Sequence, residues 1–242
     1  MSTENISTAA TGQPVVPILS ARLTSVDLNS GDQMLREEFH RLYEQTPEDF
    51  KAELIGGIVY VASPLHPSHG KPHLLLGLLV ALYEGRTPGV DASDNTTIFL
   101  GKKGEPQPDL YLRILPEYGG QSSTNQDGYV EGAPELVVEV AHSSRAIDLH
   151  KKKEDYARYG VREYLVCCVK EQQLRWFDLV AGTELEPEDG IYRLRTFPGL
   201  WINGPALVAR NHAQLMSTLE QGLATPEHVA FVRQLAERRT IT

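Results

Sequence analysis

The sequence of 242 residues is short of several residue types, and each shortage excludes a class of protein. It has two cysteines, Cys167 and Cys168, which are adjacent and would point to opposite faces of a strand, a geometry unsuited to a disulfide or a shared metal ion. Its longest apolar run, 74–82, is interrupted by Gly77 and falls far below the roughly 20 residues of a membrane-spanning helix. The N-terminus lacks the positive start and apolar run of a signal peptide. We therefore expect a cytoplasmic protein with no membrane association and no disulfides.

Basic residues are also fewer than acidic ones. The chain has 23 basic and 32 acidic residues, which gives a formal net charge of −9. Its overall field repels nucleic acid, so any contact with DNA or RNA must use a local basic patch. This balance argues against a pure nucleic-acid-binding module. It argues less against an enzyme, because a catalytic metal site itself needs carboxylates.

Several catalytic signatures are missing as well. The sequence contains no phosphate-binding loop of the Walker type, no GxGxxG turn and no GxSxG elbow. Aromatic residues make up 7% of the chain, which argues against the aromatic-rich cleft of a glycosidase that uses paired carboxylates. Apolar residues reach 41%, so the chain can still build a substantial core.

The periodicity of the apolar residues predicts a mixed α/β fold, with a central mixed β-sheet flanked by helices. A strand, helix and strand across 135–169 indicate a crossover connection onto that sheet. Gly56-Gly57 indicates the turn of a hairpin over 51–61. We expect helices at 33–45, 72–84, 148–159 and beyond 205, further strands at 96–100, 109–114, 135–141, 163–169, 173–179 and 192–197, and loops at 63–70 and 116–132.

The same pattern divides the chain into three parts. Residues 1–28 are rich in Ser and Thr and lack a clear period, so we expect a flexible arm. Residues 29–200 carry the alternating elements of one domain. Residues 201–242 are predicted to form a C-terminal helical extension that packs on the same domain.

Three carboxylates stand out because they lie in apolar strand sequence. Glu53 precedes Leu-Ile, Asp109 follows Pro108 at the start of a strand, and Glu139 lies within Val-Val-Glu-Val. A charge in a buried strand is costly unless it is paired or binds a metal ion. Each of these residues taken alone could instead be a solvated strand end or a helix cap, so the pattern favours a shared site without proving it.

A lysine on the following helix completes the candidate site. Leu149, Lys152, Tyr156 and Tyr159 are spaced by three, four and three residues and form one stripe of a helix. Lys153 flanks this stripe, so periodicity alone does not choose between Lys152 and Lys153.

Three histidines form a second pattern that competes with the first. His66, His69 and His73 are spaced by three and four residues, as metal ligands often are. His66 and His69 lie in a stretch broken by proline, and the glutamate of an HExxH motif is missing. A zinc site is the bolder interpretation, and a loop histidine near the catalytic site, with His69 the best candidate, is the simpler one.

These residues together resemble the Uma2 family, also known as DUF820, a branch of the restriction-endonuclease-like PD-(D/E)xK superfamily. The strings that carry the resemblance are AELIGGIVYVASP at 52–64, Pro108-Asp109-Leu110, PELVVEVAHSS at 134–144 and DLHKKKEDYARYGVREYLV at 148–166. The resemblance covers about residues 33–180. It departs from the family where ELIGG replaces ELIDG and where AHSS replaces SPST.

The resemblance implies a restriction-endonuclease-like core and a role for each candidate residue. Asp109 matches the aspartate of the PD step, Glu139 matches the acid of the next strand, and Glu53 matches the glutamate of ELIDG. Ala141 stands where many relatives of the superfamily have lysine, and the K-x3-Y pattern of the family assigns that role to Lys152. Asp109, Glu139 and the carbonyl of Val140 are then expected to hold Mg²⁺ or Mn²⁺, with Glu53 completing the metal shell.

The function expected from this resemblance is a metal-dependent endonuclease that hydrolyses phosphodiester bonds in nucleic acid, with DNA as the expected substrate. The alternative is a catalytically silent module that keeps the fold and binds nucleic acid or a protein partner. The apolar helix at 72–84 further predicts a homodimer, because it is more apolar than a solvent-facing helix should be.

Overall fold

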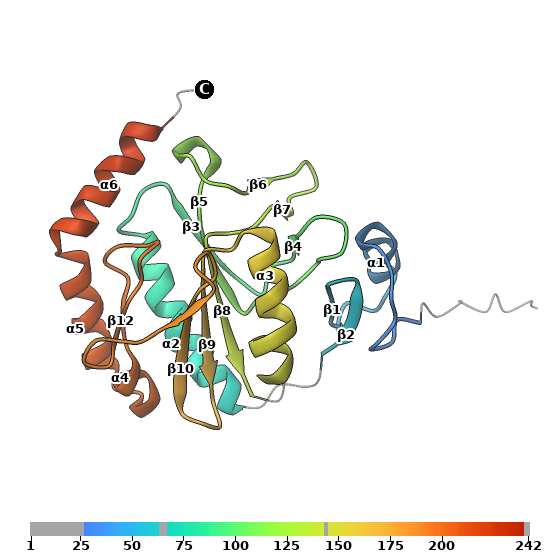
Figure 1. Cartoon of the computed structure of the whole chain (residues 1–242), viewed down its shortest axis with the longest axis horizontal. Coiled ribbons are helices and arrows are strands. Elements are labelled where there is room, and N and C mark those ends of the chain that lie inside the picture. Colours follow the sequence, from blue (N-terminus) through green and yellow to red (C-terminus); the bar gives the residue numbers. More distant parts are fainter. Residues whose placement is uncertain (1–26, 63–66, 143–144, 240–242) are drawn as a thin grey trace, which may run out of the picture.

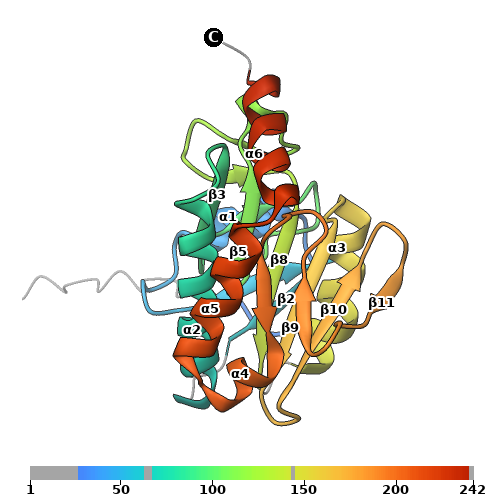
Figure 2. The same ribbon diagram turned by 90° about the vertical axis from the view of Figure 1, so that its left-hand side faces the viewer.

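The computed structural model describes residues 27–62, 67–142 and 145–239, and its centre is a six-stranded mixed sheet. Figure 1 shows this sheet between helices, and Figure 2 shows α3 and α2 on its opposite sides. The predicted mixed α/β fold is therefore confirmed. The strands in spatial order are β11 (Thr183–Leu185), β10 (Gln173–Asp178), β9 (Glu163–Cys168), β8 (Leu136–Ala141), β5 (Leu110–Ile114) and β3 (Val90–Asp94).

The only parallel pairing within this sheet is between β8 and β9, and the other neighbours run antiparallel. The parallel pair needs a crossover, which is made by a π-helical segment, η2 (Ile147–Lys152), and by α3 (Lys153–Tyr159). Gly160 ends α3 with a φ of 97°, a left-handed conformation that glycine adopts without strain. The expected strand, helix and strand order at 135–169 is thus present.

Strand β8 separates the two main apolar clusters of the protein because its side chains alternate. Leu136, Val138 and Val140 pack with α2 (Pro67–Glu84) and the C-terminal helices. Val137 and Ala141 point to the other face and pack in the cluster that contains Tyr156 and Tyr164. Glu139 lies on this second face, as the alternation predicts, and is therefore directed toward α3.

The prediction that 63–70 is a loop and that the helix begins at Pro72 is wrong where the structure describes it. Helix α2 begins at Pro67, and Pro72 lies inside it. Pro72 is in the second turn of the helix, and because it has no N–H it removes one backbone hydrogen bond, to the carbonyl of residue 68. Burial of the apolar face that carries Leu76 and Leu79 stabilises the helix as a whole.

Some other elements differ from the predictions only in length, whereas the prediction of a loop at 116–132 is wrong. The helix expected at 33–45 is α1 (Arg36–Tyr43), and the hairpin expected at 51–61 is β1 (Ala52–Ile55) and β2 (Ile58–Val61). The strand expected at 192–197 is only β12 (Ile191–Arg193), which pairs with the unpredicted β13 (Trp201–Asn203). The supposed loop at 116–132 contains a short helix, η1 (Pro116–Tyr118), and two strands, β6 (Ser123–Thr124) and β7 (Val130–Glu131), which form a small sheet with β4 (Ile98–Phe99).

The chain ends in three helices, α4 (Gly204–Ala209), α5 (His212–Leu223) and α6 (Pro226–Arg238). They share the apolar cluster of α2 and β8 through side chains such as Leu219 and Leu235. Two polar contacts connect this C-terminal part of the chain to α2 and to the residues that follow α2. The Tyr83 hydroxyl donates to the carbonyl of Pro198 at 2.9 Å, and His228 in α6 lies 2.9 Å from the Thr87 hydroxyl. The domain boundaries at residues 28 and 200 stay predictions.

Two negative expectations can be compared with the described residues. Cys167 and Cys168 are both buried and free, in agreement with the absence of a disulfide. Burial raises the pKa of the Cys167 thiol to about 12, which favours the protonated thiol at neutral pH. Within residues 27–62, 67–142 and 145–239, no helix has the length and apolar character needed to cross a bilayer.

Candidate active site

Three of the four predicted site residues meet in one buried cluster. The ammonium of Lys152, at the end of η2, lies 2.8 Å from Glu53 Oε2 and 3.0 Å from Glu139 Oε1. Glu53 comes from the β1–β2 hairpin and Glu139 from the middle of β8, so the cluster joins three separate elements. Asp109, immediately before β5, lies beside it, with its backbone N–H 3.5 Å from Glu139 Oε2.

Packing separates the two lysines that helical periodicity left open. Lys152 is only 5% exposed, and its ammonium points into the carboxylate cluster. Lys153 is directed elsewhere, with its ammonium 4.6 Å from the centre of the Phe177 ring. Lys152 is therefore the lysine of the cluster.

Glu139 is held by two donors on one oxygen. Its Oε1 accepts hydrogen bonds from Lys152 and from the hydroxyl of Tyr156 at 2.9 Å. Burial raises the pKa of Glu139 well above its usual range; Lys152 opposes this effect, and the nearby carboxylate of Asp109 adds to it. Lys152 and Tyr156 thus fix the orientation of Glu139 and leave Oε2 on the side of Asp109.

The carboxylate of Asp148 and a hydrogen bond that holds Glu53 complete the environment of Lys152. Burial by itself would lower the pKa of Lys152, but the carboxylates of Glu139, Glu53 and Asp148 outweigh it and raise the pKa well above its usual value. Asp148 Oδ1 lies 3.9 Å from the ammonium. Asp148, at which the predicted helix begins, is a buried residue in the first turn of η2, and its spacing of four from Lys152 was the signal that could have included it in the site. Glu53 Oε1 accepts from the backbone N–H of Gln107 at 2.7 Å.

Asp109 belongs to a polar network that the sequence only partly anticipated. Its Oδ2 accepts a hydrogen bond from the backbone N–H of Val140 at 2.7 Å, and its Oδ1 lies 3.3 Å from Nε2 of His69. Burial would raise the pKa of Asp109, but the hydrogen bonds from His69 and Val140 outweigh it and lower the pKa. The hydrogen bond to Asp109 in turn raises the pKa of His69.

Of the three histidines, His69 and His73 lie beside Asp109, as the simpler interpretation anticipated for His69, but they are on α2 rather than in a loop. Nε2 of His73 lies 3.1 Å from the backbone carbonyl of Asp109, and its Nδ1 lies 3.9 Å from Asp109 Oδ1. His66 lies outside the described residues. The helix that begins at Pro67 brings His69 and His73 onto one face, four residues apart.

The donor atoms of this site suit a divalent cation. The carboxylates of Glu53, Glu139 and Asp148 surround one ammonium, and Asp109 lies beside Glu139, so the formal negative charge of these residues exceeds the positive charge of the lysine. A bound cation would offset that excess. Asp109 Oδ1 and Glu139 Oε2 are the oxygens that the fold leaves clear of Lys152, and hard divalent cations take such ligands.

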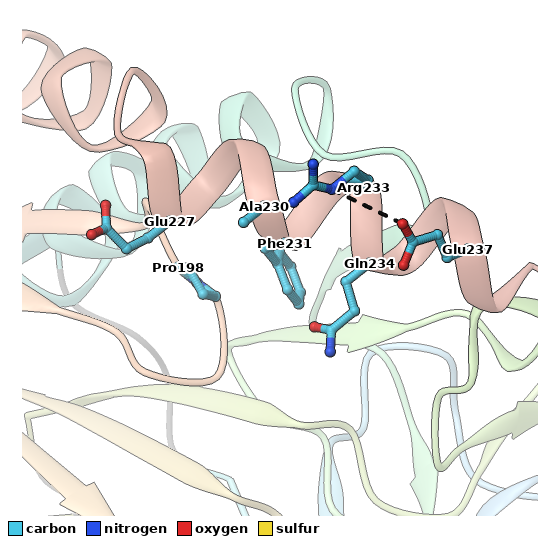
Figure 3. A pocket seen from close by; sticks show the side chains of 7 residues that line it. All are labelled: Pro198, Glu227, Ala230, Phe231, Arg233, Gln234 and Glu237. Atoms are coloured by element: carbon cyan, nitrogen blue, oxygen red, sulfur yellow. Dashed lines mark ion pairs between the residues drawn. The ribbon is translucent and has the colours of Figure 1, made fainter.

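A separate surface pocket of about 440 Å³ lies along α6. Figure 3 shows its lining residues, among which Arg233 and Glu237 form an ion pair of 4.0 Å on the helix surface. None of its lining residues belongs to the carboxylate cluster. The buried cluster, and not this pocket, therefore carries the candidate chemistry.

Comparisons with known proteins agree with the geometry. The chain matches the family model "Uma2: Putative restriction endonuclease" over residues 36–206. A similar fold is found in the crystal structure of a putative nuclease belonging to DUF820 from Anabaena variabilis, with a TM-score of 0.51 and 13% sequence identity over 74% of this chain and 97% of the other. None of the curated proteins compared with the chain is a match.

The family match covers most of the sequence and includes all four predicted site residues, Glu53, Asp109, Glu139 and Lys152. The structural match shows that the fold of this chain resembles that of the DUF820 protein. The chain belongs to the Uma2 family of restriction-endonuclease-like proteins.

Proposed function

We propose that this protein is a metal-dependent endonuclease that hydrolyses phosphodiester bonds in nucleic acid, with DNA as its substrate. The observation that carries the proposal is the buried cluster in which three carboxylates face a single lysine and a fourth, that of Asp109, lies beside them. A fold that needed only stability would gain little from such a cluster, because buried charges rarely outperform apolar packing. Membership of the Uma2 family gives the cluster its chemical context.

Asp109 and Glu139 are the residues that would hold Mg²⁺ or Mn²⁺, with the carbonyl of Val140 as a further oxygen ligand. When bound, such an ion lowers the pKa of a coordinated water and polarises the scissile phosphate. The backbone N–H of Val140 holds the carboxylate of Asp109 in place through Oδ2 and leaves Oδ1 for other partners. Glu53 would complete the metal shell.

Lys152 supplies positive charge at the point where the phosphate gains negative charge in the transition state. Its ammonium has three donors, and the contacts with Glu53 and Glu139 use two of them. The third donor is then available to orient the attacking water or to bind a phosphate oxygen. Glu53 is a positioning residue for this lysine, because it is itself anchored by the N–H of Gln107.

Tyr156 positions Glu139. Its hydroxyl donates to Glu139 Oε1, the same oxygen that Lys152 contacts, which keeps the carboxylate from rotating. Loss of this hydroxyl in Tyr156→Phe should therefore weaken metal binding. The cleavage rate at a saturating metal concentration should change less.

The experiment is a cleavage assay on plasmid DNA, single-stranded DNA and RNA with Mn²⁺, Mg²⁺ or EDTA. Asp109→Ala and Lys152→Ala should abolish cleavage. Lys151→Ala is the matched control, because the Lys151 side chain is 61% exposed and forms an ion pair with the surface residue Glu154, at 3.8 Å. Metal-dependent cutting by the wild type and the control supports the proposal. Equal silence of all four proteins on every substrate refutes it and leaves the catalytically silent binding module.

We further propose that the protein acts as a homodimer. Leu74, Leu78 and Leu82 of α2 are four residues apart, so they form one stripe, and they are 74%, 43% and 38% exposed. An exposed apolar stripe on an otherwise packed helix fits a two-fold contact with a second copy. Light scattering of wild type and Leu78→Ser tests this: a monomeric wild type removes the dimer from the proposal.

A further inference from the structure

Three potential ligand atoms converge on one side of Asp109. They are Oδ1 of Asp109, a histidine nitrogen of His69 and a histidine nitrogen of His73, and all lie within 4.8 Å of one another. The His69 Nε2 and His73 Nδ1 atoms are 3.3 Å and 3.9 Å from Asp109 Oδ1. Ligands about 2.1 Å from a tetrahedral ion stand roughly 3.4 Å apart, so small rotations of the two rings would complete such a shell.

The hydrogen bond of His73 prepares one nitrogen for a ligand. Its Nε2 lies 3.1 Å from the backbone carbonyl of Asp109, an acceptor, so Nε2 must carry the proton in that bond. In the neutral ring the lone pair is then on Nδ1, the atom that faces Asp109 Oδ1. A carbonyl that fixes the tautomer of a histidine from behind is the usual arrangement around a metal-binding imidazole.

His69 provides the second observation. The residue is only 6% exposed, and its Nδ1 has no hydrogen-bond partner in the part of the chain that the structure describes. A buried imidazole with one unpartnered nitrogen is poorly explained by stability alone. Its other nitrogen, Nε2, is directed at Asp109 Oδ1. In a neutral ring that binds a metal ion through Nε2, the proton would be on Nδ1.

We propose that His69, His73 and Asp109 form a binding site for a transition-metal dication, with Co²⁺ and Zn²⁺ bound more tightly than Mg²⁺. Two imidazole nitrogens and one carboxylate suit these ions, whereas Mg²⁺ is bound through oxygen ligands and retained waters. Three protein ligands leave a coordination position open, as in catalytic sites. The proposal deepens the proposed function, because Asp109 serves both, but the binding of the ion does not require cleavage.

Calorimetric titration of the full chain, stripped of metal, with Zn²⁺, Co²⁺ or Mg²⁺ tests this site. We expect one high-affinity transition-metal ion per chain and a Kd at least about 100-fold lower for Co²⁺ and Zn²⁺ than for Mg²⁺. His69→Ala and His73→Ala should each weaken Co²⁺ binding by at least about tenfold. The visible absorption of bound Co²⁺ gives a second readout, because its bands change when imidazole nitrogen leaves the shell.

Two variants and one spectrum keep the test interpretable. His212→Ala is the matched control, because His212 is exposed at the start of α5, and it should bind Co²⁺ like the wild type. His69→Gln keeps a polar side chain at the buried position, and its near-ultraviolet circular dichroism establishes that the fold is intact when binding is measured.

Equal affinity for Co²⁺ and Mg²⁺, or unchanged Co²⁺ binding in both folded histidine variants, overturns the inference. Its failure is distinguishable from that of the proposed function. Cleavage with Mg²⁺ in a protein that binds no transition metal overturns the histidine site alone. Tight Co²⁺ binding that depends on both histidines, in a protein that cuts no substrate with any metal, supports the site and refutes the endonuclease.

Discussion

Removing the charge of Lys152 should cost this protein much of its stability. In Lys152→Met the side chain keeps its length, but the carboxylates of Glu53 and Glu139 lose the cation that lies 2.8 and 3.0 Å away. Both partners are largely buried, with side-chain exposures of 19% and 4%, so water cannot replace the lysine well. The variant therefore isolates the cost of unpaired buried carboxylates.

The magnitude follows from the burial of the cluster. Breaking a buried ion pair by removal of one partner costs about 3–5 kcal/mol, because an uncompensated charge remains. For a chain of this size, that loss lowers the melting temperature by roughly 6–20 °C. Lys151→Met is the control: its ammonium is 3.8 Å from Glu154 on the exposed surface, where an ion pair contributes at most about 1 kcal/mol.

Urea unfolding at constant pH in EDTA measures the free energy of unfolding of both variants. Glu139→Gln should recover part of the loss when it is combined with Lys152→Met, since it removes one of the stranded charges. A double-mutant cycle then gives a coupling energy between the two positions. A loss below about 1 kcal/mol in Lys152→Met, equal to that of Lys151→Met, would refute the reasoning that the pair is buried and mutually dependent.

Three further predictions concern metal, pH and packing. Millimolar Mn²⁺ should raise the melting temperature of the wild type by mass action, and scanning calorimetry with and without EDTA measures the shift; no shift contradicts a metal site. Burial raises the pKa of Glu105 to about 6 despite its 2.8 Å contact with His40. The fold therefore favours the protonated acid, stability falls by up to about 2 kcal/mol as the pH rises from about 4.5 to about 6, and Glu105→Gln should abolish this decline in urea titrations. Gly222→Ala would place a Cβ 2.3 Å from the carbonyl oxygen of Gly199 and should destabilise the protein by roughly 1–3 kcal/mol, whereas Gly70→Ala meets open space and should cost nothing in the same assay.

The sequence determined those features that depend on local periodicity. The alternation in β8 placed Glu139 on the face opposite Val138 and Val140, because neighbouring side chains of a strand must diverge. Helical spacing placed Lys152 on the same stripe as Tyr156, and the pair indeed shares Glu139 as a partner. The motifs around these residues also sufficed to identify the family that the later comparison established.

Short and polar elements escaped the sequence analysis. Strand β3, Val-Asp-Ala-Ser-Asp, has no apolar alternation, and it forms because β5 offers it an edge with matching hydrogen bonds. The start of α2 at Pro67 was missed because Pro72 is a strong local signal for the beginning of a helix. In the structure, Pro72 lies inside α2. In both places tertiary contacts outweigh the local signal.

The composition of the site was decided by the tertiary structure. Sequence spacing could not choose between Lys152 and Lys153, because both lie within one turn of the stripe; the choice depends on which ammonium meets Glu53 from a distant hairpin. Nor could it place His69 and His73 against Asp109, which is 36 residues from the nearer histidine along the chain. Periodicity determines which face of an element a side chain occupies, but only the packing of one element on another determines what that face meets.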